Sequence, residues 1–135
     1  MIKLIVGKKG SGKTKILLDM VNAAAKETSG NVVCVEKDAN LTFDVDYSVR
    51  LLDADNYSVV GYDVLYGFLS GLLAGNYDIT EIFVDGTLRM VGREYEKLGE
   101  FFERIDKIAE EANTKLVFTI SADESELPDS VKKYI

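Results

Sequence analysis

Four short, largely apolar runs constrain the fold of this chain more than any other feature. They span residues 2–6, 32–35, 82–84 and 116–120, and none alternates polar with apolar residues as a half-exposed strand does. Strands of this kind are buried on both faces, which is typical of a parallel sheet covered by helices. We therefore expect these four runs to form the interior of such a sheet.

Segments with helical periodicity lie between the runs. Apolar residues recur at helical spacing over residues 13–28, 63–73 and 95–112, although two glycines weaken the second pattern. Over residues 43–51 apolar and polar residues alternate instead, which predicts a half-exposed edge strand or a hairpin. The order of elements predicts an α/β fold, a three-layer sandwich with a mostly parallel central sheet and right-handed crossovers.

Length and composition favour an ordinary globular protein. The 135 residues fit a single domain, residues 1–135, without a linker or repeat that would divide it. The one cysteine, Cys34, cannot form an internal disulfide, and the lack of histidine removes the usual zinc ligands. We expect a cytoplasmic protein without a membrane segment, because the first apolar run is too short for a span or a signal peptide.

The charge distribution separates the beginning of the chain from the rest. A net charge of -7 disfavours binding to nucleic acid. Five lysines nevertheless lie within the first fifteen residues, and most acidic residues come later. This arrangement favours a small phosphate-bearing ligand near the start of the chain.

A glycine-rich loop lies between the first run and the first helical segment. Residues 7–14 read Gly-Lys-Lys-Gly-Ser-Gly-Lys-Thr. Glycines let backbone N–H groups turn inward to form an anion-binding concavity, which the positive end of the following helix reinforces. In this pattern the lysine reaches the β- and γ-phosphates and the hydroxyl coordinates magnesium. We predict a site for a nucleoside triphosphate with Mg²⁺ at Gly7, Lys8, Lys9, Gly10, Ser11, Gly12, Lys13, Thr14 and Lys15.

On this motif and its strand–loop–helix setting, the chain resembles the P-loop NTPases. Residues 82–85, Ile-Phe-Val-Asp, look like the Walker B element, which implies that Asp85 binds Mg²⁺ directly or through water. The order of elements is similar to the RecA-like branch of the superfamily. The guanine-reading pattern Asn-Lys-x-Asp is absent, so ATP is the expected nucleotide.

Hydrolysis needs further groups that orient water and stabilise charge. Many P-loop ATPases carry a glutamate directly after the Walker B acid, but here that residue is Gly86. The RecA-like resemblance implies Glu36, after the second run, as the catalytic base, with Asp38 as the fallback; either could equally be a solvated loop acid. Ser121 or Thr119 would place a hydroxyl near the terminal phosphate. Ser121 is the preferred candidate, because threonine is a common strand residue and packing explains Thr119 nearly as well. The predicted catalytic residues are Lys13, Glu36 and Ser121.

The chain has four arginines. Arg89 or Arg93, shortly after the Walker B-like run, could act on a bound or neighbouring nucleotide. Arg104 falls on the polar side of a helical segment, where solvation explains it.

Three functions are compatible with these features. The first is a small ATPase or an ATP-dependent switch, in which the nucleotide orders the loop after Asp85 for a partner to sense. The second is a nucleoside or small-molecule kinase, although few arginines are present to hold an acceptor. The third is a non-hydrolysing nucleotide-binding module that uses the tyrosine-bearing stretch 57–77 as an interface. A protein partner or a homo-oligomer is plausible because RecA-like sites are often completed by a neighbouring subunit.

Overall fold

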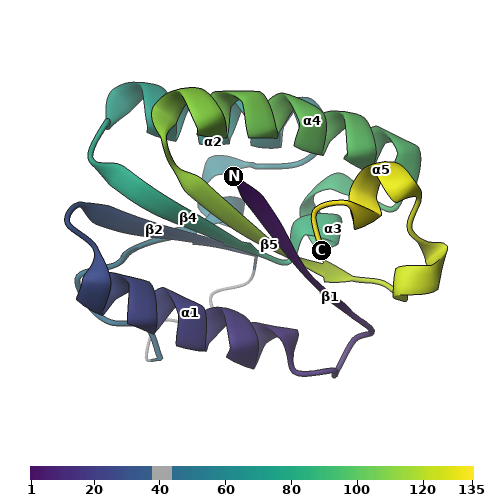
Figure 1. Ribbon diagram of the computed structural model, residues 1–135, viewed down its shortest axis with the longest axis horizontal. Coiled ribbons are helices and arrows are strands. Elements are labelled where there is room, and N and C mark those ends of the chain that lie inside the picture. Colours follow the sequence, from purple (N-terminus) through teal and green to yellow (C-terminus); the bar gives the residue numbers. More distant parts are fainter. Residues whose placement is uncertain (38–43) are drawn as a thin grey trace.

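The computed structural model describes residues 1–37 and 44–135, and it confirms the α/β class. Its centre is a five-stranded sheet in the order β1-β5-β4-β2-β3, and every strand pair is parallel (Figure 1). The four apolar runs form its interior and one edge. The strands are β1 (Ile2–Gly7), β2 (Asn31–Glu36), β3 (Arg50–Asp53), β4 (Ile79–Asp85) and β5 (Lys115–Ser121).

Helices cover both faces of the sheet (Figure 1). Helix α1 (Lys13–Glu27) lies on one face, and α2 (Tyr62–Gly75) and α4 (Tyr95–Ala112) lie on the other. The sheet is therefore the middle of three layers. Shorter elements complete the described chain: the 3-10 turns η1 (Ala54–Tyr57) and η2 (Glu124–Glu126), and the helices α3 (Thr87–Val91) and α5 (Asp129–Lys132).

Two hydrophobic clusters, one on each face, explain why the strand runs do not alternate. Neighbouring residues such as Val117 and Phe118 point to opposite faces, yet both are fully buried. On the α4 side, Phe102 packs against Phe118 with ring centroids 5.0 Å apart. On the α1 side, Leu17 and Phe83 belong to the smaller cluster. Burial on both faces removes the polar positions that would otherwise mark a strand.

The prediction of an alternating strand over residues 43–51 is wrong in position and in its hairpin alternative. The edge strand is β3, which runs parallel to β2, and residues 46–49 form a turn closed by Val49 N–H donating to the Asp46 carbonyl at 3.0 Å. The Asp46 carboxylate accepts from the backbone N–H and hydroxyl of Ser48, at 2.9 and 2.8 Å. Local side-chain bonds of this kind compete with strand pairing. Residue 43 lies outside the described residues.

The segment after Asp85, expected as a loop, begins with helix α3 instead. Three of its residues, Thr87, Leu88 and Met90, are buried, and the Met90 carbonyl accepts from Gly61 N–H at 2.8 Å. Burial of this face accounts for the helix. Within residues 1–37 and 44–135, no helix is long and apolar enough to cross a membrane.

The parallel arrangement sends the carboxyl ends of all five strands to one edge of the sheet. The glycine-rich loop follows β1 there, while Asp85 ends β4 and Ser121 ends β5. Ligands of open α/β sheets bind at this edge. The fold thus gathers the predicted site residues from distant parts of the chain.

Candidate functional site

The glycine-rich loop makes a tight turn from β1 into α1. Gly10 and Gly12 adopt left-handed backbone conformations with φ of 84° and 90°, which favour glycine. At Gly7 the constraint is space, because a Cβ there would lie 2.4 Å from the Ser11 hydroxyl oxygen. Ser11 N–H donates to the Lys8 carbonyl at 3.0 Å and closes the turn.

The loop leads directly into the amino-terminal end of α1. Gly12 is the N-cap residue, it provides no side-chain cap, and the first turn holds no acidic residue. The first N–H groups of a helix have no partner within the helix and carry partial positive charge. This end of α1 is therefore suited to an anion.

Lys13 is the buried cation of the loop. Its side chain is 7% exposed, and its ammonium group donates to the Lys8 carbonyl at 2.9 Å. Burial lowers the pKa of Lys13, and the negative charge of Asp85 partly opposes that shift. An anionic phosphate would relieve the cost of burying this charge.

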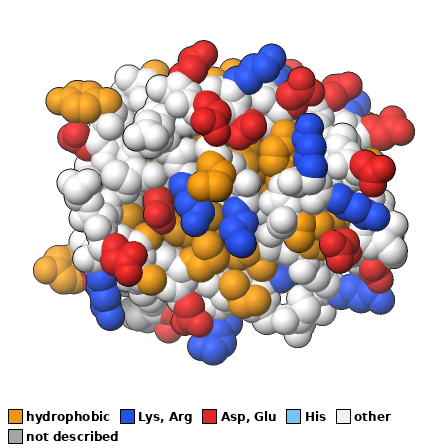
Figure 2. Space-filling model, in the orientation of Figure 1, with side chains coloured by type: hydrophobic (Ala, Val, Ile, Leu, Met, Phe, Trp, Pro, Cys, Tyr) orange, Lys and Arg blue, Asp and Glu red, His pale blue; other side chains and the backbone are white. Residues whose placement is uncertain are grey.

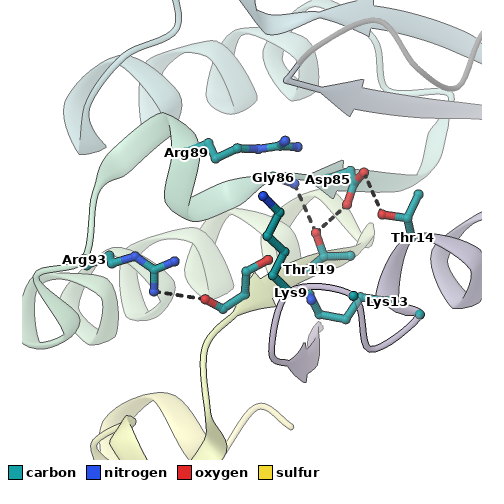
Figure 3. A pocket seen from close by; sticks show the side chains of 11 residues that line it. Lys9, Lys13, Thr14, Asp85, Gly86, Arg89, Arg93 and Thr119 are labelled. Carbon is teal, nitrogen blue, oxygen red and sulfur yellow. Dashed lines mark hydrogen bonds between the residues drawn. The ribbon is translucent and has the colours of Figure 1, made fainter.

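Asp85 is held in place by two threonines (Figure 3). The Thr119 hydroxyl donates to Oδ1 at 2.6 Å, and the Thr14 hydroxyl contacts Oδ2 at 3.4 Å. Thr119 also accepts from Gly86 N–H at 3.1 Å. Thr119 lies on β5, between β1 and β4, so its hydroxyl connects the Walker B-like strand β4 to the strand that pairs with β1, which precedes the loop. Sequence reasoning ranked Thr119 below Ser121 and could not see this bond.

These groups surround a cavity of about 610 Å³ at the carboxyl edge of the sheet. It is lined by Lys9, Gly10, Gly12, Lys13, Thr14, Asp85, Gly86, Arg89, Arg93, Thr119 and Ser121. A cavity of this size matches those that hold small ligands and cofactors. Its walls combine several cations with a single carboxylate.

The remaining loop residues of the predicted set do not line the cavity. Lys8 forms an ion pair with Asp123 at 3.3 Å, and Lys15 lies near Asp19 at 3.8 Å on the exposed side of α1. Gly7 and Ser11 instead shape the turn. Among the loop lysines, only Lys9 and Lys13 face the cavity.

Glu36 is buried next to Asp85 but is not part of the cavity lining. The two acids are register partners on β2 and β4, and Glu36 is 2% exposed. Burial, together with the charges of Glu36 and Asp85, raises the pKa of the Cys34 thiol to about 12. The candidate base thus lies one strand away from the cavity wall formed by Asp85. Asp38, the fallback, lies outside the described residues.

Two arginines from the segment after β4 line the cavity. Arg89 Nη2 donates to the Lys37 carbonyl at 3.3 Å. Arg93 Nη1 donates to the Ser121 carbonyl at 3.0 Å and to the Tyr95 hydroxyl at 3.2 Å. The sequence signal for this pair was its position shortly after the Walker B-like run. Arg104, in contrast, stacks on Tyr66 at 3.9 Å from the ring centroid, away from the site.

Compared with known protein families and with curated proteins, the sequence matches no family model and no curated protein. In the part of the chain that the structure describes, no group of three or more His, Cys, Asp or Glu side chains is arranged to hold a metal ion.

Proposed function

We propose that this protein binds ATP together with Mg²⁺ and acts as a small ATPase or an ATP-dependent switch of the RecA-like P-loop class. One observation carries the proposal: the phosphate-binding turn and the uncapped start of α1 face the same cavity as the Thr14–Asp85 pair. A nucleotide's phosphates need the first feature, and their metal needs the second.

The donor set fits magnesium. Mg²⁺ prefers oxygen ligands in an octahedron and takes one or two from protein, the rest from phosphates and water. Thr14 Oγ1 and Asp85 Oδ2 lie 3.4 Å apart. Adjacent ligands of an octahedral Mg²⁺ lie about 2.9 Å apart, so only a small adjustment is needed. Held there by Thr14 and Asp85, the ion would supply positive charge that neutralises part of the charge of the phosphates.

The residues of the site then have physical roles. The loop N–H groups hold the phosphates, and Lys13 turns from the Lys8 carbonyl to the β- and γ-phosphates. Thr119 keeps Asp85 oriented toward Thr14. Ser121 lines the cavity and stays the predicted hydroxyl near the terminal phosphate.

Slow turnover is part of the proposal. A general base must lie within hydrogen-bonding reach of the attacking water, directly or through one water molecule. Glu36, the predicted base, is buried outside the cavity lining, and Gly86 has no side chain. These positions support a protein that holds ATP for long periods, as a switch does.

The experiment is a titration with ATP, ADP, GTP and a non-hydrolysable ATP analogue, each with Mg²⁺, followed by a phosphate-release assay. Lys13→Ala should abolish binding, because it removes the only buried cation among the described cavity residues. Lys26→Ala is the matched control, since Lys26 is an exposed lysine in the last turn of the same helix. Equal affinity of wild type and Lys13→Ala would overturn the proposal.

A kinase stays the second candidate because Arg89 and Arg93 both face the cavity, where they could hold an anionic acceptor. Phosphate transfer that requires an added nucleoside or other acceptor would favour the kinase over the ATPase. Tight binding without either reaction would favour a nucleotide-binding module.

We include a protein partner or homo-oligomer in the proposal and leave nucleic acid out. On the face shown in Figure 2, Lys and Arg side chains are interspersed with Asp and Glu side chains instead of forming a basic surface. Tyr57 and Tyr77 are 52% and 93% exposed, whereas Tyr62 packs on Phe101 and Tyr66 lies under Arg104. The exposed pair marks where an interface from the 57–77 stretch would be centred.

A further inference from the structure

Arg89 lies across the cavity from the phosphate-binding loop. It belongs to α3, whose chain continues from the end of β4, whereas the loop follows β1. In Figure 3 its side chain extends above Gly86 and Asp85, and Lys9 extends from the loop toward the same space. The cavity thus has cations on two opposing walls.

Gly86 creates the space that Arg89 fills. A Cβ at residue 86 would lie 2.6 Å from Arg89 Nη2 and 2.9 Å from Nε. Gly86 also has a left-handed backbone with φ of 79°. The guanidinium therefore packs directly against the residue that follows Asp85, and the bond to the Lys37 carbonyl orients it there.

The position of Thr14 and Asp85, the residues that would hold the metal, determines which phosphate Arg89 would contact. With the inner phosphates on the loop, Thr14 and Asp85 would hold the Mg²⁺ that neutralises the charge of the outer ones. The terminal phosphate would then lie toward the end of β4, where Gly86 and the Arg89 guanidinium are. An arginine fork matches the oxygens of a phosphate group.

We propose that Arg89 is a ligand of the terminal phosphate and makes the protein select nucleoside triphosphates over diphosphates. This role depends on the proposed nucleotide binding at the loop and gives it a specificity. Arginine stays protonated and cannot accept a proton, so Arg89 stabilises the bound triphosphate without activating water. Arg89 would therefore detect whether the terminal phosphate is present, and it does not supply the base that turnover needs.

The test compares affinities for a non-hydrolysable ATP analogue and for ADP, both with Mg²⁺, in the wild type and five variants. In Arg89→Gln the affinity for the analogue should fall about ten- to hundredfold more than the affinity for ADP, the worth of one charge-assisted contact. Arg89→Lys keeps the charge but loses the fork, and its loss should be intermediate. Arg104→Gln, an exposed arginine outside the cavity, is the control and should match the wild type.

The outcomes separate this role from the proposed function. If Lys13→Ala abolishes binding but Arg89→Gln lowers the affinities for the analogue and for ADP equally, or lowers neither, Arg89 is not a ligand of the terminal phosphate. A selective loss in Arg93→Gln with none in Arg89→Gln also overturns it, in favour of the other arginine. If the wild type binds neither nucleotide, the function itself fails. Arg89 is exposed, so Arg89→Gln is expected to fold, and circular dichroism and thermal unfolding check that it does.

Discussion

Replacing Thr119 by valine tests whether a hydroxyl, and not packing, determines the position of Asp85. Thr119 is 2% exposed and lies on β5, the strand between β1 and β4 in the sheet. Its hydroxyl donates to Asp85 Oδ1 at 2.6 Å and accepts from Gly86 N–H at 3.1 Å. Valine has the same shape but makes neither bond.

The magnitude follows from these two bonds. A hydrogen bond to a charged group contributes about 1.5–3 kcal/mol, and a buried N–H left without an acceptor costs about 1–3 kcal/mol. The added methyl group returns about 1 kcal/mol through burial. We expect Thr119→Val to lower the free energy of unfolding by about 2–4 kcal/mol.

Thr119→Ser is the matched control, because it keeps the hydroxyl and deletes only the methyl group, at a cost of about 1 kcal/mol. Burial alone ranks stability as valine, threonine, serine, whereas the bonds to Asp85 and Gly86 rank it as threonine, serine, valine. Urea unfolding distinguishes the two orders, provided that the m-value is the same in the three proteins. A valine variant at least as stable as the serine variant would refute the reasoning. A weakened Mg²⁺ dependence of nucleotide binding in Thr119→Val should accompany the loss.

Two further predictions concern the loop and the buried thiol. Gly7→Ala should lower the free energy of unfolding by about 1–3 kcal/mol through overpacking against Ser11, and it should weaken nucleotide binding. Gly67→Ala, on the exposed face of α2 with open space around it, should raise the free energy of unfolding by about 0.5–1 kcal/mol. Thermal unfolding compares the two variants, and changes of the same sign would contradict the steric account. Burial, with Glu36 and Asp85, raises the pKa of Cys34 from 9.0 to about 12, so above pH 9 the native state binds one proton more than the unfolded state and stability falls toward pH 12. Relative to Cys34→Ala, the wild type should lose about 1 kcal/mol between pH 9 and pH 10, and an equal slope in both proteins would show that the thiol does not contribute.

The fold was predictable where burial left a continuous signal. Both faces of the interior strands are covered, so Val117 and Phe118 are apolar in succession and the run stands out. Helix α4 was equally clear, because one apolar stripe faces the sheet. The edge strand was misplaced because the alternation around Asp46 reflects a turn held by side-chain bonds and not a pleated strand. Periodicity cannot distinguish these two causes over a few residues.

The site divides in the same way, between contacts that are local in sequence and contacts that depend on strand order. The glycine loop can be interpreted from residues 7–14 alone, because its geometry involves only near neighbours such as Gly7 and Ser11. The Thr119–Asp85 bond spans 34 residues and exists only because β5 lies beside β4. Placing Arg89 over Gly86 similarly requires knowing that the chain after β4 turns into a helix at once.

Gly86 shows how this long-range information changes the chemistry that the sequence suggests. As a letter in the sequence it marks a missing carboxylate and so weakens the case for hydrolysis. In the structure its lack of a Cβ leaves room for a guanidinium 2.6 Å from where that carbon would be. At the end of the strand that carries Asp85, a guanidinium lies close to the position where many P-loop ATPases carry a glutamate. A cation there attracts phosphate oxygens and cannot activate water as a carboxylate does. Under the proposed function, Gly86 would therefore weaken catalysis and, through Arg89, strengthen recognition of a triphosphate, the combination that a nucleotide-dependent switch requires.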